Sequence, residues 1–187
     1  MLDRDKAMEL LLSLQPEAHL VQHAVAAEAV MRGLARHCGE DETLWGLTGL
    51  LHDVDFPQTR ETPERHGLAA MDILGDKLPP EALAAIRAHN ADHTGCAPTT
   101  PLDYALRCGE TVTGLIVTAA LVRPTGMEGM QPSSLKKKMK DKAFAASVSR
   151  DHIRECANIG LELGDFLQIA IDAITPVATA AGCVRSA

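Results

Sequence analysis

The sequence predicts an all-α protein, folded as a compact bundle of about seven to nine helices. Three observations support this fold class. Ala, Leu, Met and Glu dominate while aromatic residues make up only 3% of the chain, and this composition favours helices over strands. Apolar residues recur at helical spacing in successive segments that Pro or Gly separates. No segment combines the alternating pattern of a strand with turn residues on both sides.

These breaks place the helices along the chain. The principal helices are expected at about residues 3–14, 17–38, 41–52, 62–75, 80–90, 102–122, 151–163 and 164–181. The first ends before Pro16, because the residue before a proline avoids the helical region, and the second ends at Gly39. Pro57 closes the region after the third helix.

The later helices begin and end at equally clear signals. Thr62 is a candidate N-cap with Pro63 at the first helical position, and Gly75 ends that helix. The stretches 93–101 and 126–134 are predicted loops because they are rich in Gly, Pro, Thr and Ser. We expect a single domain over residues 1–187, with a core at about 18–124 and C-terminal helices at 133–181 packed on it.

Composition also limits the functional class. The formal net charge is −7, from 25 acidic and 18 basic residues, and this charge argues against nucleic-acid binding. The sequence contains no run of about 18 apolar residues of the kind that predicts a membrane span, and the N-terminus lacks a signal-peptide pattern. The five cysteines are scattered without a C-x-x-C pair. A reduced, cytoplasmic protein is therefore expected.

The segment LLHDVDF, residues 50–56, is the first candidate functional motif. His52, Asp53 and Asp55 follow an apolar helix face, and burial of an ionised carboxylate is costly unless it is paired or binds a metal. His nitrogen and carboxylate oxygen suit divalent Fe, Mn, Co, Ni or Zn, with Mg as a further candidate. Two ions bridged by a carboxylate form a standard site for cleaving phosphate esters, and Asp53 is placed to be that bridge.

Further candidate ligands lie on other helices. His23, His66 and His89 fall on or beside apolar helix faces, and Glu110 lies on the long helix at 102–122. Each has a structural alternative: a histidine can be a hydrogen-bonded core residue, and Glu110 can pair with Arg107 one turn before it. Asp55 can likewise cap the turn before Pro57. A regular order of such residues over four helices favours a shared metal site.

The ordered set resembles the HD-domain metal-dependent phosphohydrolase superfamily, as represented by small bacterial HD proteins. The resemblance covers about residues 18–124 and includes LLHDVD (50–55), RHGLAAMDIL (65–74), AIRAHN (85–90) and TGLIVTAALVRP (113–124), with a similar tail at 133–153. It implies that His23, His52 and Asp53 are primary ligands of a divalent metal ion. Glu110 stands where the family usually has Asp. The positions of His66 and His89 match second-metal histidines, so one or two ions are expected.

By this resemblance the protein hydrolyses a phosphomonoester or phosphodiester, with a small phosphorylated molecule, of the nucleotide type, as substrate. Asp55 is a candidate to orient the attacking water or to accept its proton. Arg123, Lys136 and Lys137 are candidate substrate contacts, although a lysine run is also typical of a solvated helix face. A metal-binding regulatory or ligand-sensing domain without turnover is the alternative function. A helix at about 166–181 is apolar enough to cover the core or to join two copies in a homodimer.

Overall fold

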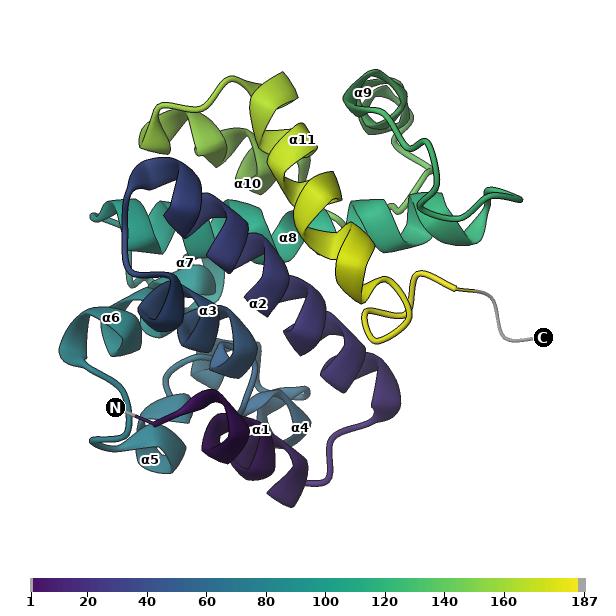
Figure 1. The fold of residues 1–187 in the computed structure, drawn as a ribbon. Coiled ribbons are helices and arrows are strands. Elements are labelled where there is room, and N and C mark those ends of the chain that lie inside the picture. The colour runs from purple at the N-terminus through teal and green to yellow at the C-terminus, as the bar shows by residue number, and fades with distance from the viewer. Residues whose placement is uncertain (1, 185–187) are drawn as a thin grey trace.

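The computed structural model describes residues 2–184, and this part of the chain is helical without any strand (Figure 1). The predicted all-α class is therefore confirmed. The α-helices are α1 (Arg4–Ser13), α2 (Ala18–Cys38), α3 (Glu42–Leu51), α4 (Phe56–Thr59), α5 (Ala70–Leu74), α6 (Pro80–His89), α7 (Ala91–Thr94), α8 (Pro101–Leu121), α9 (Pro132–Lys140), α10 (Arg150–Arg154) and α11 (Leu163–Ile174). Three short 3-10 helices are η1 (Pro63–Arg65), η2 (Glu155–Ile159) and η3 (Thr175–Val177).

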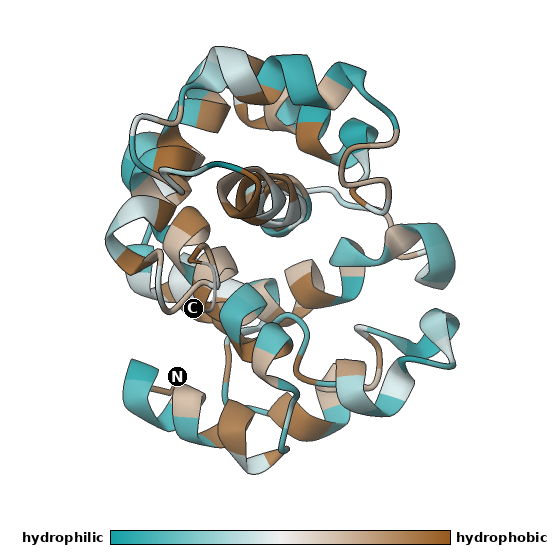
Figure 2. Cartoon of the chain, turned by 90° about the vertical axis from the view of Figure 1, so that its right-hand side faces the viewer, coloured by the Kyte–Doolittle hydropathy of each residue, from teal (hydrophilic) through white to brown (hydrophobic). Residues whose placement is uncertain are grey.

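The two 21-residue helices, α2 and α8, form the centre of the bundle. They pack on each other, α3 packs on α2, and α6 packs on α8. Viewed along its axis, α8 lies in the middle with the other helices around it (Figure 2). Leu34 of α2 and Leu106 and Ile116 of α8 are fully buried in the core that results. Residues carried by these central helices are therefore held on a rigid frame.

Side-chain caps fix where several of these helices begin. The Asp3 carboxylate accepts a hydrogen bond from Lys6 N at 2.9 Å, and Asp41 accepts from Leu44 N at 3.0 Å. Thr100 and Asp103 form a capping box at the start of α8. Such caps satisfy backbone N–H groups that have no partner within the helix. They fix the residues at which α1, α3 and α8 begin.

Gly49 of α3 sets how closely α3 approaches α2. A Cβ atom at this position would lie 2.8 Å from the Ala27 carbonyl oxygen and 2.8 Å from Met31 Cγ. Glycine thus permits the α3 backbone to approach the Ala27 carbonyl and the Met31 side chain more closely than alanine would allow. The end of α3, at Leu51, is brought against α2 by this packing.

The C-terminal helices cover one side of the central pair. Helix α11 packs on α2, α8 and α9, while α10 and η2 pack on α8. The buried side of α11 consists of Phe166, Leu167, Ala170, Ile171 and Ile174. Of the two roles expected for this apolar helix, the structure shows that it covers the core of its own chain.

The predicted helix at 62–75 is wrong as a continuous element. The chain forms η1, then a turn with φ +86° at Gly67, and then α5. Thr62 makes no side-chain cap, and its hydroxyl donates to the Thr59 carbonyl at 3.4 Å instead. The break occurs because the Gly67 and Ala70 N–H groups donate to the carboxylate of Asp55 rather than to helix carbonyls.

Other boundaries also differ from the expectation. The sequence does not predict the short helices α4, which contains Pro57, and α7, which starts before the predicted loop at 93–101 and extends into it. Helix α9 begins inside the predicted loop at 126–134. The helix expected at 151–163 is divided into α10 and η2, and the last one ends at Ile174 because Pro176 lacks the N–H that an α-helix requires. These short pieces raise the number of helices above the predicted range.

Within residues 2–184, no helix has both the length and the apolar character that crossing a membrane requires.

Candidate metal centre

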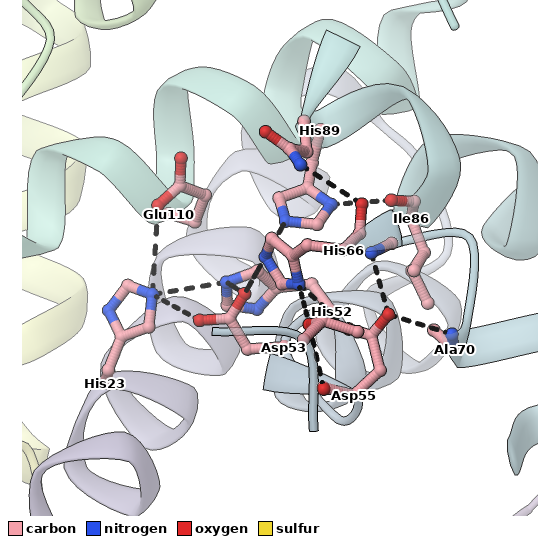
Figure 3. Close-up of polar contacts among 12 residues, drawn as sticks. His23, His52, Asp53, Asp55, His66, Ala70, Ile86, His89 and Glu110 are labelled. Atoms are coloured by element: carbon pink, nitrogen blue, oxygen red, sulfur yellow. Dashed lines mark hydrogen bonds and ion pairs between the residues drawn. The ribbon is translucent and has the colours of Figure 1, made fainter. Parts of the chain in front are cut away.

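Four imidazoles and one carboxylate converge between α2, α3, α6 and the segment after η1 (Figure 3). His23 lies on α2, and His52 and Asp53 follow directly after α3. His66 follows η1, and His89 is the last residue of α6. The structure thus brings together five of the six predicted ligands, and these five come from four separate segments.

Two of the imidazoles are oriented by their own helices. His52 Nδ1 donates to the Gly49 carbonyl at 2.8 Å, and His89 Nδ1 donates to the Ile86 carbonyl at 2.5 Å. A carbonyl oxygen can only accept a hydrogen bond, so the proton of each neutral ring is on Nδ1. The Nε2 atom of each ring therefore presents a lone pair to the centre of the cluster.

The other two imidazoles have the same orientation through side chains. His66 Nδ1 lies 2.9 Å from Asp55 Oδ1, which accepts its proton. His23 Nδ1 lies 2.9 Å from Thr113 Oγ1, and the Thr113 hydroxyl donates its own proton to the Glu110 carbonyl at 2.6 Å. Partners of this kind fix the tautomer of metal-binding histidines. All four Nε2 atoms consequently point toward the centre, where they can serve as ligands once unprotonated.

The Nε2 atoms form two close pairs on either side of Asp53. His23 Nε2 and His52 Nε2 are 3.2 Å apart, and His66 Nε2 and His89 Nε2 are 3.0 Å apart. Two facing lone pairs repel each other unless a proton or a metal ion lies between or beside them. The Asp53 carboxylate lies 3.1–3.5 Å from all four Nε2 atoms, with Oδ1 near His52, His66 and His89 and Oδ2 near His23.

This donor set fits divalent metal ions. The ligand atoms form two groups in which all atoms lie within 4.8 Å of one another, namely His23–His52–Asp53 and Asp53–His66–His89. Neutral imidazole nitrogen with carboxylate oxygen suits first-row divalent metals, and Asp53 belongs to both groups. The arrangement has room for two ions that share one carboxylate.

The electrostatics of the cluster also favour a cation. Burial lowers the pKa of His52 to about 3, so this ring is neutral. Burial also tends to lower the pKa of His66, but hydrogen bonds and charges of Asp53 and Asp55 outweigh it and raise this pKa to about 10. Burial opposes ionisation of Asp53, yet the surrounding histidines, His52 first, hold its pKa well below the usual range. At neutral pH the metal-free cluster therefore holds a positive charge on His66 beside the ionised Asp53, and a metal ion would take the place of this proton.

Asp55 does not have the predicted catalytic position. Its side chain is fully buried, and Oδ2 accepts hydrogen bonds from Gly67 N at 2.8 Å and Ala70 N at 3.0 Å, while Oδ1 accepts from His66. It does not cap α4 either. With both oxygens engaged inside the protein, Asp55 has no access to an attacking water. It orients His66 and anchors the turn that follows.

Glu110 lies at the edge of the centre. Its Oε2 is 3.8 Å from His23 Nε2, its Oε1 accepts from the Thr111 hydroxyl, and burial raises the pKa of its carboxyl. It belongs to neither of the two ligand groups. The alternative pairing with Arg107 is wrong, because the Arg107 guanidinium donates to Glu155 at 2.7 Å.

The three predicted substrate contacts lie elsewhere. Arg123 comes just after the end of α8. It lies 13 residues beyond Glu110, which corresponds to about 20 Å along a helix. Its guanidinium donates to the Gly126 carbonyl at 2.9 Å and holds the loop after α8. Lys136 and Lys137 are on α9, at the periphery beside α11 (Figure 1). The structure therefore does not support a substrate contact by these side chains, because Arg123 holds the loop after α8 and α9 packs on α11.

Several residues that support the centre were not recognised from the sequence. Arg107 donates to the carbonyls of Ala88 and His89 at 3.2 and 3.0 Å. The Asn90 amide donates to the carbonyls of Pro63 and His66 at 2.7 and 3.1 Å. Both tie the end of α6 to neighbouring segments. The position of Asn90 directly after a candidate ligand was the only signal available.

Gly67 is required by the turn that carries His66. A Cβ atom there would lie 2.8 Å from the Ile86 carbonyl oxygen, and the backbone has φ +86°. We expect Gly67→Ala to lower the free energy of unfolding by roughly 2–3 kcal/mol, from backbone strain and this contact together. Chemical denaturation measures it. Gly39→Ala is the matched control, since Gly39 has φ +74° but no atom within 4 Å of the added Cβ; an equal loss in both variants would contradict the role of the Ile86 contact.

Comparison with known families agrees with the geometry. A family model described as HD domain matches residues 20–141, a span that includes His23, His52, Asp53, His66, His89 and Glu110. The chain belongs to the HD-domain family. HD domains are mostly metal-dependent hydrolases, and the His/Asp cluster of this member fits a metal site. No curated protein and no solved structure matches the chain.

Proposed function

We propose that this HD-domain protein is a phosphohydrolase that cleaves a phosphomonoester or phosphodiester, of the nucleotide type, at a centre for two divalent metal ions. One observation carries the proposal: two groups of ligand atoms share Asp53, and every imidazole has Nδ1 engaged with a protein acceptor and turns Nε2 toward these groups. A structural histidine cluster has no need for four rings of the same tautomer around one carboxylate.

The residues divide into two ligand sets. His23, His52 and Asp53 would hold one ion, with Glu110 near enough to His23 to complete that set. Asp53, His66 and His89 would hold the other. When bound, two divalent ions would activate water at neutral pH and neutralise negative charge on the phosphoryl oxygens.

The protein's own contribution is orientation. Asp55 holds His66, Thr113 holds His23, and the carbonyls of Gly49 and Ile86 hold His52 and His89. Because these partners lie on packed helices or tight turns, the four histidines are held in position without a metal. Such preorganisation spares the site the cost of ordering side chains when an ion or substrate binds.

The metal content of the purified protein tests the proposal. We expect about two divalent ions per chain for the wild type and about one for His66→Ala, measured by elemental analysis after loading with Mn, Fe, Co, Ni, Zn or Mg. His37→Ala, on the exposed side of α2, is the control and should keep both ions. One ion in both the wild type and His66→Ala would remove His66 from the site.

The loaded protein should then release phosphate or alcohol from a panel of nucleotide esters. Retention of metal without hydrolysis of any phosphoester would overturn the proposal in favour of a metal-binding regulatory domain. No metal under any loading condition would overturn both.

A further inference from the structure

A cavity of about 320 Å³ opens beside the metal centre. His23 and Glu110 form the wall nearest the centre, and the remaining lining residues are Thr111, Gly114, Ser147, Val148, Ser149 and His152. This volume is in the range of small-molecule sites. A phosphate ester held at the centre would extend its remaining part into this space.

The lining of the cavity indicates an uncharged occupant. It offers hydroxyl groups, an imidazole and apolar surface, but no Lys or Arg among the residues that the structure describes. The Arg150 guanidinium donates to the Val148 carbonyl of the lining at 2.6 Å, but it is engaged there and with the carbonyls of Ala145 and Asp141. The Arg107 guanidinium likewise donates to Glu155 and to two backbone carbonyls. A second phosphate group in this cavity would have neither Lys nor Arg as a partner, whereas the hydroxyls of a sugar or nucleoside would find hydrogen-bonding groups.

His152 is the one ionisable base in the cavity that the metal centre does not use. Its Nε2 lies 2.8 Å from Asp92 Oδ2, and its side chain is 20% exposed. Burial tends to raise the pKa of Asp92, but His152 and Arg107 outweigh this and lower it, so Asp92 is ionised and accepts the proton of Nε2. The four metal-centre histidines have Nδ1 engaged and Nε2 free. In His152 this is reversed, since Nδ1 makes no hydrogen bond within residues 2–184.

We propose that His152 donates a proton to the leaving oxygen of an uncharged alcohol, of the sugar or nucleoside type, that occupies this cavity; the inference rests on the proposed phosphohydrolase function. In this step the oxygen of water forms a bond to phosphorus and releases one proton to solvent. The bond from phosphorus to the alcohol oxygen breaks, and its electron pair stays on that oxygen. The oxygen takes the Nδ1 proton of the His152 imidazolium, whose Nε2–H remains bonded to Asp92. Nδ1 regains a proton from solvent, and the products are the free alcohol and phosphate.

Leaving-group dependence separates this role from a structural one. We would compare the wild type, His152→Gln and Asp92→Asn on p-nitrophenyl phosphate, whose leaving group needs no proton, and on alkyl phosphates that need one. The alkyl panel consists of the ribonucleoside 5′-monophosphates and glucose 6-phosphate. The control is His19→Gln, because His19 also pairs with a carboxylate, Glu17 at 3.3 Å, but on the exposed surface. Unfolding temperatures of all variants are measured with the kinetics.

For His152→Gln, we expect kcat on the best alkyl phosphate to fall by roughly 10²–10³-fold, the usual contribution of a general acid, and by less than about tenfold on p-nitrophenyl phosphate. Asp92→Asn should show the same selectivity with a smaller loss, and His19→Gln no loss. The wild type should also prefer a nucleoside monophosphate to the diphosphate of the same nucleoside by at least about a hundredfold. Should His152→Gln fail to fold, Asp92→Asn carries the test, because the Asp92 side chain is 61% exposed.

Equal losses on both leaving groups, or no loss on either, would overturn the role of His152. Equal cleavage of monophosphate and diphosphate would overturn the uncharged occupant. A wild type that cleaves p-nitrophenyl phosphate but no alkyl phosphate would overturn this inference while the proposed function stands. Failure to cleave any ester when loaded with metal would overturn the proposed function itself.

Discussion

Replacing Asp53 by alanine is expected to remove both metal ions and to reduce phosphoester hydrolysis by roughly a thousandfold or more. Asp53 is the one residue that belongs to both ligand groups, with its carboxylate 3.1–3.5 Å from all four Nε2 atoms. Loss of the ions removes several kcal/mol of charge stabilisation in the transition state, and each 1.4 kcal/mol is about a factor of ten in rate. Elemental analysis and steady-state kinetics on the same preparation measure both effects.

The natural control is Asp76→Ala, which removes an exposed carboxylate from the turn after α5. It should retain the metal content and the activity of the wild type. A variant at Asp53 that still binds two ions would show that the histidines suffice and that the carboxylate is not the bridge.

Removing the buried carboxylate of Asp55 is expected to have the largest effect on stability. In Asp55→Ala, the N–H groups of Gly67 and Ala70 and the Nδ1–H of His66 lose their acceptor inside the protein. An unsatisfied buried donor costs about 1–3 kcal/mol, so we expect the free energy of unfolding to fall by about 3–5 kcal/mol. Denaturant titration of the metal-free protein measures this loss.

Asp55→Asn distinguishes orientation from stability. The asparagine carbonyl can still accept from the backbone N–H groups, but its amide cannot accept from His66 Nδ1. We therefore expect a smaller loss of stability with a 10–100-fold weaker affinity for the second metal ion, which is the usual cost of removing such a partner. An unchanged metal affinity in Asp55→Asn would show that His66 does not depend on Asp55 for its orientation.

The candidate ligands could be found from the sequence because most of them interrupt a local apolar pattern, and the family resemblance then implied their roles. His23 and His89 lie on apolar helix faces, and the His52-Asp53 pair ends an apolar helix. Each of these polar groups therefore interrupts an apolar pattern. The fold class follows from the same periodicity. These patterns lie within single helices, so they can be recognised without knowing how the helices pack.

The errors arose where distant segments decide the structure. The sequence predicts a catalytic role for Asp55 because its partners, Gly67 and Ala70, lie twelve and fifteen residues away in a turn that helical spacing does not predict. The prediction that Arg123 contacts substrate fails because Arg123 follows the end of α8, about half the length of the helix away from Glu110. His152 was missed because its partner, Asp92, is sixty residues earlier in the chain.

The close contact at Gly49 connects the metal centre to the folding of the whole protein. Gly49, which lets α3 approach the Ala27 carbonyl, also supplies the carbonyl that holds His52. Asp53 comes directly after His52, at the end of α3, and α3 packs on α2. The centre is complete only when α2 and α3 are packed, so an ion that binds there binds the folded chain alone. By mass action, metal uptake and the packing of the core share one equilibrium. Metal supply in the surroundings of the protein would thus set how much of it stays folded, and not only how much of it is active.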